Sequence, residues 1–107
     1  MIRGSRGGVP PARPCGARGS EQRGVRYAVV VQADELLALS TVLVSPTSTA
    51  APPRSFRPTI EVEATTTRVL VEQTTPVSPE RLGGSVGRLS AAELRELDNA
   101  LAIVLGL

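Results

Sequence analysis

The sequence predicts a small, mainly β protein that ends in one amphipathic helix. Short segments rich in valine, isoleucine and threonine recur through the chain, separated by turns that contain proline or glycine. The last segment instead repeats leucine at helical spacing. No internal repeat is present, and strands do not alternate with helices as in doubly wound folds. With 107 residues, 41% of them hydrophobic, the chain suits a single small domain with its own core.

The first 25 residues differ in composition from the rest of the chain. Gly, Pro and Arg make up most of this stretch, and its apolar residues follow neither a strand period nor a helix period. Pro10, Pro11 and Pro14 lack the backbone N–H that a central strand donates. We therefore predict an irregular Gly/Pro/Arg-rich arm over residues 1–17 and a folded domain over residues 18–107. Without a regular first strand, we expect the next strand to have an open edge.

Short strands are predicted through the centre of the chain. The first run is β-branched and suits a strand buried on both faces, whereas the third alternates polar and apolar side chains and suits a half-buried strand. Pro46 ends the second run, because a proline donates no hydrogen bond to a neighbouring strand. The predicted strands, in order, are residues 27–32, 41–45, 59–63, 68–73 and 85–89. A short helical turn or connection is expected at 33–40, and a proline-stiffened loop at 47–55.

The C-terminal segment carries the clearest local signals in the chain. Ser90 is a natural N-cap and Glu93 follows three residues later, so the two form a capping box. Leu94, Leu97 and Leu101 then recur at helical spacing, and Gly106 lies near the end. The spacing predicts a helix of roughly fifteen residues, whose leucine stripe faces the core in preference to a partner.

Residue types that are missing exclude several classes of function. The chain has no histidine, which excludes a histidine general base, the Ser-His-Asp and Cys-His systems and any histidine metal ligand. Its single Cys15 allows neither an intramolecular disulfide nor a thiolate zinc site. No run approaches the roughly 18–20 apolar residues of a membrane helix, and the N-terminus lacks the apolar core of a signal peptide. We therefore expect a soluble, cytoplasmic protein without a membrane partner.

The charge is unevenly distributed along the chain. Residues 1–25 hold five Arg and one Glu, whereas residues 26–107 hold seven Arg and nine acids. All twelve basic residues are arginines. A GC-rich coding bias explains this as well as phosphate binding does. The charge balance thus permits a nucleic-acid partner without requiring one.

Four segments match the motifs of one known family in that family's order. Residues 19–34 read GSEQRGVRYAVVVQAD, with an arginine at the mouth of an apolar strand, and residues 41–49 read TVLVSPTST, a strand followed by proline and hydroxyl residues. Residues 70–74 read LVEQT, and residues 87–107 supply a last strand and a helix. Each motif is short, but together they make the chain resemble the MazF/PemK family of bacterial toxins over about residues 18–107.

The resemblance implies both a fold and an activity. Members of that family are small SH3-like barrels, of the CcdB/MazF-like plasmid-toxin fold, with a C-terminal helix. They are usually homodimers, and many cleave single-stranded mRNA without a metal ion. A cognate antitoxin holds them inactive. The chain is thus expected to be a metal-independent endoribonuclease of a toxin–antitoxin system that uses no cofactor, binds single-stranded RNA and a cognate antitoxin, and forms a homodimer.

The resemblance places Arg26 at the position of the family's essential arginine. RNA cleavage by the neighbouring 2′-hydroxyl builds negative charge on a pentacovalent phosphate, and a guanidinium can donate two parallel hydrogen bonds to its oxygens. Because arginine stays protonated, charge stabilisation suits Arg26 better than a role as general base. The alternative is a solvated arginine at the end of a strand.

Ser48 occupies the position of the family's active Thr or Ser, where its hydroxyl would hold the phosphate or orient the 2′-hydroxyl. Ordinary hydrogen bonding within the loop is the alternative for Ser48. Residues expected to bind RNA or support the site are Glu21, Gln22, Thr47, Thr49 and Gln73. For Glu21 the interpretation as a solvated loop acid is favoured over a role in the site. Glu72, which ends the same strand as Gln73, is at least as well explained as the partner of an arginine in the fold.

The N-terminus departs from the family pattern. Met1 to Gly4 match the family's opening, but residues 5–17 replace an aromatic-rich first strand with Gly, Pro and Arg. Two alternatives to the ribonuclease therefore remain. One is a degenerate toxin that binds an antitoxin without catalysis, and the other is an inhibitor of gyrase like CcdB, which rests on fold analogy alone.

Overall fold

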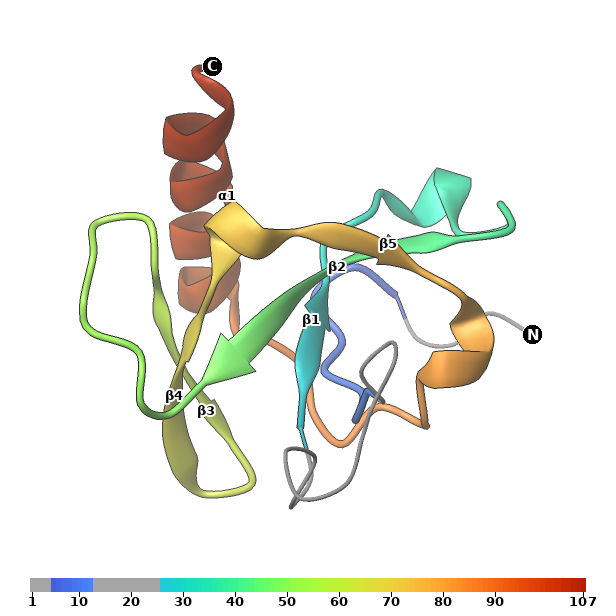
Figure 1. Ribbon diagram of the computed structural model, residues 1–107, viewed down its shortest axis with the longest axis horizontal. Helices are drawn as coiled ribbons and strands as arrows, with labels where there is room; N and C mark the ends of the chain where they lie inside the picture. The colour runs from blue at the N-terminus through green and yellow to red at the C-terminus, as the bar shows by residue number, and fades with distance from the viewer. Residues whose placement is uncertain (1–4, 13–25) are drawn as a thin grey trace.

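The computed structural model describes residues 5–12 and 26–107, which form one curled antiparallel sheet with a helix beside it (Figure 1). The strands are β1 (Ala28–Val30), β2 (Val42–Ser48), β3 (Thr59–Val62), β4 (Thr65–Val69) and β5 (Thr75–Val77). Single 3-10 turns lie at η2 (Asp34–Leu36), η3 (Val71–Gln73) and η4 (Pro79–Arg81), and the helix is α1 (Ala91–Leu105). The mainly β class with a C-terminal helix is confirmed.

Strand β2 runs through the middle of the sheet and organises it. One edge pairs with β1, while the other edge pairs first with β5 and then with β4, which leads on to β3 (Figure 1). The prediction that this strand ends at Pro46 is wrong, because it continues to Ser48. Pro46 is tolerated because it lies between the stretch paired with β5 and the stretch paired with β4. Its carbonyl still accepts a hydrogen bond from the Leu70 N–H, at 2.8 Å.

The strand predicted at 68–73 is displaced. Strand β4 begins earlier, at Thr65, because the β3–β4 hairpin closes through a two-residue turn at Glu63 and Ala64. The chain leaves the sheet after Val69 and turns through η3. Strand β5, which we did not predict, then contains Pro76 at the edge of the sheet, where a proline is tolerated.

Residues 5–12 occupy the position of a first strand beside β1. The Gly7 N–H donates to the Val30 carbonyl at 2.8 Å, and the Ala28 N–H donates to the Pro10 carbonyl at 3.1 Å. On the other side, the Val86 N–H donates to the Val9 carbonyl at 3.0 Å. The prediction that β1 has an open edge is therefore wrong. A proline has no backbone N–H to donate, but its carbonyl still accepts a hydrogen bond, as that of Pro10 does here. The strand predicted at 85–89 is reduced to an isolated bridge between Arg88 and Gly8.

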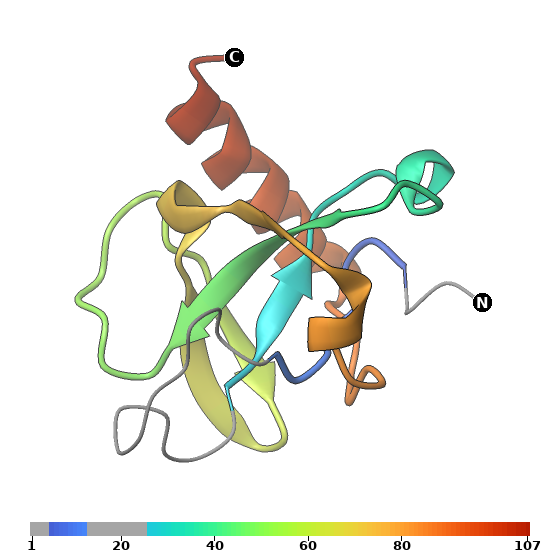
Figure 2. The same cartoon turned by 45° about the vertical axis from the view of Figure 1, so that its right-hand side comes forward.

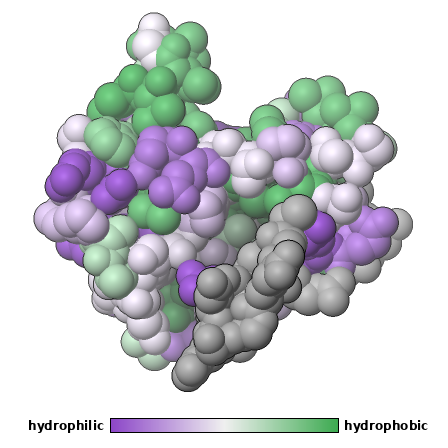
Figure 3. All heavy atoms as spheres, in the orientation of Figure 1, coloured by the Kyte–Doolittle hydropathy of each residue, from purple (hydrophilic) through white to green (hydrophobic). Residues whose placement is uncertain are grey.

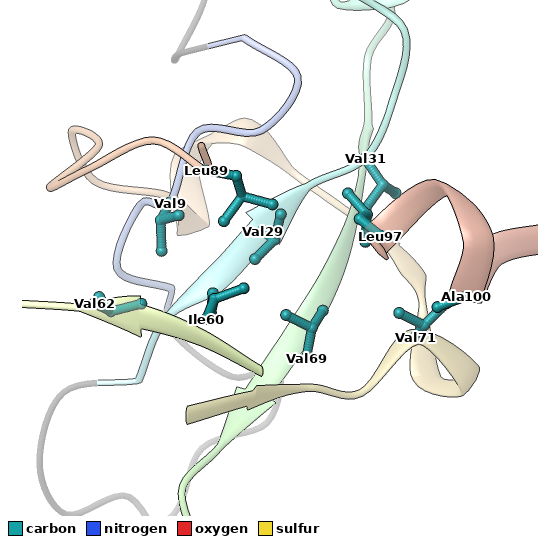
Figure 4. Packing of buried hydrophobic residues seen from close by; sticks show 10 residues of the cluster. All are labelled: Val9, Val29, Val31, Ile60, Val62, Val69, Val71, Leu89, Leu97 and Ala100. Atoms are coloured by element: carbon teal, nitrogen blue, oxygen red, sulfur yellow. The ribbon is translucent and has the colours of Figure 1, made fainter. Parts of the chain in front are cut away.

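Strand β1 is buried on both faces, as its β-branched run predicts. Val29 and Val31 face the main core, whereas Ala28 and Val30 face a smaller cluster on the other side of the sheet. Figure 4 shows side chains from the N-terminal segment, the sheet and α1 converging in the main core. The main core contains Val9, Val29, Val31, Ile60, Val62, Val69, Val71, Leu89, Leu97 and Ala100.

Helix α1 has the predicted ends and the predicted inner face. The Ser90 hydroxyl accepts from the Glu93 N–H at 3.1 Å, and the Glu93 carboxylate accepts from the Ser90 N–H at 2.8 Å, so the capping box is confirmed. Gly106 ends the helix in the left-handed conformation. Leu97 is fully buried, and Leu94 and Leu101 pack against the same core.

The end of α1 projects beyond the sheet (Figures 1 and 2) and carries exposed apolar side chains. Figure 3 shows hydrophobic surface gathered there. The exposed residues of this end are Ile103, Val104, Leu105 and Leu107. Across the described segments, 5–12 and 26–107, none of the helices has the length and apolar character needed to span a membrane.

Candidate functional site

Arg26 and Ser48 lie at the same end of the β1–β2 pair and border the same hollows. The pairing of the two antiparallel strands ends at Ala28 and Pro46, and each of the two residues lies two positions beyond that pair. Between them, the Tyr27 carbonyl accepts from the Thr47 backbone N–H at 3.1 Å and from the Thr47 hydroxyl at 2.9 Å. Two residues that are distant in the sequence are thus brought together at the end of β2.

Two open hollows flank this end of β2. The first, of about 620 Å³, lies toward the β3–β4 hairpin, and we call it the hairpin groove. It is lined by Arg26, Tyr27, Thr47, Ser48, Thr49, Ala50, Val62, Glu63, Thr65 and Thr67. The second, of about 500 Å³, lies toward β5 and is called the β5 groove. Besides the four residues shared by both grooves, which are Arg26, Tyr27, Thr47 and Ser48, it is lined by Ala12, Ala28, Val44, Pro46, Leu70, Gln73, Thr75, Pro76 and Val77.

The predicted site residues that the structure describes gather around these grooves. Arg26, Thr47 and Ser48 border both of them. Thr49 lines only the hairpin groove, and Gln73 reaches the β5 groove from η3, where we had expected the end of a strand. Glu21 and Gln22 lie outside the described residues.

The Ser48 hydroxyl forms a hydrogen bond with the backbone of the loop that follows it. Its oxygen accepts a hydrogen bond from the Ala50 N–H at 3.2 Å. A hydroxyl has one donor and two acceptor lone pairs, so this contact leaves the O–H free to donate to an anionic oxygen. The local hydrogen bond and a role in ligand binding are therefore compatible, and the bond fixes the direction of the oxygen.

Several residues that line the grooves or lie beside them escaped the sequence analysis. Tyr27 adjoins Arg26, but an aromatic residue in a strand is most often part of a core. Glu63 lies in a turn without the Asn-Gly or Asp-Gly signal that marks most two-residue hairpins. Arg68 is paired directly with Ser48 across β2 and β4, and its guanidinium donates to the Ala51 carbonyl at 3.2 Å. That neighbour could not be found without knowing the register of two strands twenty residues apart.

Glu72 is the partner of an arginine, as the sequence analysis expected. The Arg57 guanidinium donates to a single Glu72 carboxylate oxygen from Nη2 at 2.6 Å and from Nε at 3.1 Å. These hydrogen bonds lower the pKa of Glu72 below its ordinary value, against a smaller opposing effect of burial. Arg57 also donates to the Pro52 carbonyl at 3.0 Å, so the ion pair fastens the loop after β2 to η3.

Acidic side chains form no metal-binding cluster in the part of the chain that the structure describes. No group of three His, Cys, Asp or Glu residues in 5–12 and 26–107 is arranged to hold a metal ion. The polar groups of the two grooves are instead hydroxyls, one guanidinium, one carboxylate and one amide.

Fold and grooves together define a half-barrel protein whose arginine and hydroxyl side chains meet at the open end of the sheet. The chain belongs to the PemK-like, MazF-like toxins of type II toxin–antitoxin systems, whose family model matches residues 6–105. A Mycobacterium tuberculosis protein described as a toxin is 43% identical over 91 residues, covering 84% of this chain and 85% of the relative. The endoribonuclease MazF9 of the same organism is 40% identical over 104 residues, covering 85% of this chain and 86% of the relative.

Solved structures show the same architecture. A mycobacterial endoribonuclease in complex with its cognate antitoxin superposes with a TM-score of 0.80 at 19% identity, covering 97% of this chain and 96% of that chain. MazF from Deinococcus radiodurans superposes with a TM-score of 0.79 at 19% identity, covering 100% and 99%. The fold expected from the resemblance is therefore confirmed.

Proposed function

We propose that this chain is a metal-independent endoribonuclease that cleaves single-stranded RNA, with mRNA as its cellular substrate in the cytoplasm. The observation that carries the proposal is that Arg26 and Ser48 both border both grooves at the end of β2. A relative 40% identical to the chain is an endoribonuclease, which supports the same reaction class. Single strands are favoured because their base edges are accessible, whereas those of an A-form helix are largely hidden.

In the proposed reaction the RNA supplies its own nucleophile. The 2′-hydroxyl oxygen loses its proton to water and attacks the adjacent phosphorus, and the bond to the 5′-oxygen of the next nucleotide breaks. The departing oxygen takes up a proton, so that a 2′,3′-cyclic phosphate and a 5′-hydroxyl result. Arg26 donates to the phosphate oxygens on which charge accumulates. Ser48, held by its hydrogen bond to Ala50, donates its O–H to the same phosphate and fixes its position.

The proposed partners are a cognate antitoxin and a second copy of the chain. Structures of similar fold include an endoribonuclease with its cognate antitoxin and MazE–MazF from D. radiodurans. The exposed apolar side chains at the end of α1, among them Ile103 and Leu105, supply surface of the kind that a protein contact covers.

The test is RNA cleavage by the purified protein in excess EDTA. A long unstructured RNA is incubated with wild-type protein, Arg26→Ala, Ser48→Ala and the control Arg95→Ala, which changes an exposed arginine on α1. We expect Arg26→Ala to slow cleavage by about 100-fold or more, because removal of one donor to a transition-state oxyanion costs about that much. Ser48→Ala should have a smaller effect and Arg95→Ala none. Light scattering on the wild-type sample should give the mass of a dimer.

The outcomes separate the alternatives. Cleavage that persists in EDTA and disappears with Arg26→Ala supports the proposed reaction. A folded wild-type protein that leaves the RNA intact would overturn it and favour the antitoxin-binding module without catalysis. Cleavage that continues unchanged in Arg26→Ala would show that the reaction has another centre.

A further inference from the structure

The hairpin groove presents more functional groups than the binding of a phosphate requires. Its volume of about 620 Å³ lies within the range that holds small organic ligands. Beyond Arg26 and Ser48 it presents one aromatic ring, one carboxylate and several hydroxyls. The hydroxyls come from Thr47, Thr49, Thr65 and Thr67, and the last of these is buried. An aromatic surface beside hydrogen-bonding groups is the usual composition of a site for an unstacked nucleobase.

Tyr27 is placed to offer a ring to that groove. Its half-buried side chain packs against the main core and also lines the groove. The backbone at this position is held from the other strand by the two hydrogen bonds from Thr47 to the Tyr27 carbonyl. A ring supported by a core is a stacking surface that loses little entropy when a base binds. Because Tyr27 and Arg26 line the same groove, the base that the ring meets belongs to a nucleotide close to the proposed scissile phosphate.

Glu63 brings a carboxylate to the same groove through an unusual turn. Glu63 and Ala64 are the two central residues of the β3–β4 hairpin, with φ of 51° and 65°. Left-handed backbone at both positions is the type I′ turn, which is normally made by Asn and Gly. Among the described residues, no side chain pairs with the Glu63 carboxylate. Both oxygens are therefore available to a ligand.

We propose that the hairpin groove is a nucleobase pocket in which Tyr27 stacks on the base and Glu63 selects it. This inference rests on the proposed ribonuclease function. A carboxylate only accepts hydrogen bonds, so it favours a base edge that carries an amino group. Guanine fits best, because its ring N–H and amino group present two adjacent donors. Uracil fits worst, because its single ring N–H is flanked by two carbonyl oxygens that repel the carboxylate.

The experiment maps every cut in a long unstructured RNA by sequencing the new 5′ ends. We compare wild type, Glu63→Gln and the control Glu61→Gln, a carboxylate on β3 two residues away that does not line the groove. Wild type should avoid uracil at one position beside the cut. Glu63→Gln, whose amide can both donate and accept, should raise the share of uracil there about tenfold, since one base contact discriminates by that order. Glu61→Gln should keep the wild-type profile.

A second pair of variants tests the stacking. Tyr27→Leu keeps apolar bulk against the core but removes the ring face, and Tyr27→Phe keeps the ring. We expect Tyr27→Leu to lower kcat/KM about tenfold, because a stacked base contributes at least that much, and Tyr27→Phe to lie near wild type.

Four results would overturn the inference in whole or in part. Wild-type cuts without regard to the neighbouring base, or an unchanged profile in Glu63→Gln, would remove Glu63 from selection while leaving the ribonuclease in place. Equal kcat/KM for Tyr27→Leu and wild type would remove the stacking. Wild-type protein that does not cleave RNA at all would overturn the proposed function together with the pocket.

Discussion

From the ion pair of Arg57 and Glu72 we predict how the stability of the fold depends on pH. Its hydrogen bonds lower the pKa of Glu72 in the folded protein, so the unfolded chain binds a proton more readily. The stabilisation is therefore fully present above the ordinary value of 4.5 and is lost as the pH falls through the lowered pKa. At pH 7 we expect Glu72→Gln to reduce the free energy of unfolding by about 0.5–1 kcal/mol, as for other pairs near the surface.

Urea unfolding of wild type and Glu72→Gln from pH 7 down to pH 3 measures this difference. It should shrink as the pH falls through the lowered pKa of Glu72, because the protonated carboxyl is neutral like the glutamine that replaces it. Glu96→Gln, which changes an exposed carboxylate on α1, controls for the general effect of removing a charge. A difference between wild type and Glu72→Gln that grows with acidity would contradict the assigned direction.

Single residues of the site could be predicted to the extent that they lie in short motifs. Arg26 and Ser48 were singled out because each lies in a motif of the family that the sequence resembles, and the structure places both beside the same two grooves. Tyr27 and Glu63 were not singled out because they line a common hollow that only the sheet register creates. Their identities alone are equally typical of a core residue and a solvated loop acid.

The β3–β4 hairpin predicts a stabilising substitution. Ala64 has φ of 65°, a region that costs a residue with a side chain about 1–2 kcal/mol and costs glycine almost nothing. Part of that gain is offset because glycine makes the unfolded chain more flexible. We expect Ala64→Gly to raise the free energy of unfolding by about 0.5–1 kcal/mol in urea titrations.

A second alanine tests whether the sign comes from the backbone. Ala33 has φ of −59° and is also exposed, so Ala33→Gly should lower stability slightly, through the unfolded state alone. Destabilisation by both substitutions would show that the left-handed turn at Ala64 is not strained in solution.

Elements with local signals were predicted well, and those with non-local causes were not. Helix α1 and its capping box follow from residues within one turn of each other. Strand β3 follows from its alternation. Strand β2 crosses Pro46 only because its two partners on that edge leave a gap there. Strand β5 exists because the distant Val42 to Val44 segment offers it hydrogen bonds, and its own sequence, with a central proline, argues against a strand.

At the level of the whole molecule, the sheet is completed by a segment whose composition argues against it. Residues 5–12 hydrogen-bond to β1 on one side and to residues 82–89 on the other, without forming a regular strand. The prolines there donate nothing, but the carbonyls of Pro10 and Pro11 both accept hydrogen bonds. The sheet is thus completed by backbone carbonyls that accept hydrogen bonds and by one buried apolar side chain. A search for alternating β-branched residues detects neither of them.

That apolar side chain is Val9, and it predicts how much the fold depends on the N-terminal segment. Val9 is 2% exposed and packs in the main core with β1, β3 and α1, whereas Val86, which bonds to it through the backbone, is 39% exposed. Val9→Ala should lower the free energy of unfolding by about 2 kcal/mol, through lost burial and the cavity that remains. Val86→Ala should change it by less than about 0.5 kcal/mol. Urea unfolding of both variants decides the matter: equal, small effects would mean that the segment is not part of the folded core, and that β1 has the open edge its sequence context predicts.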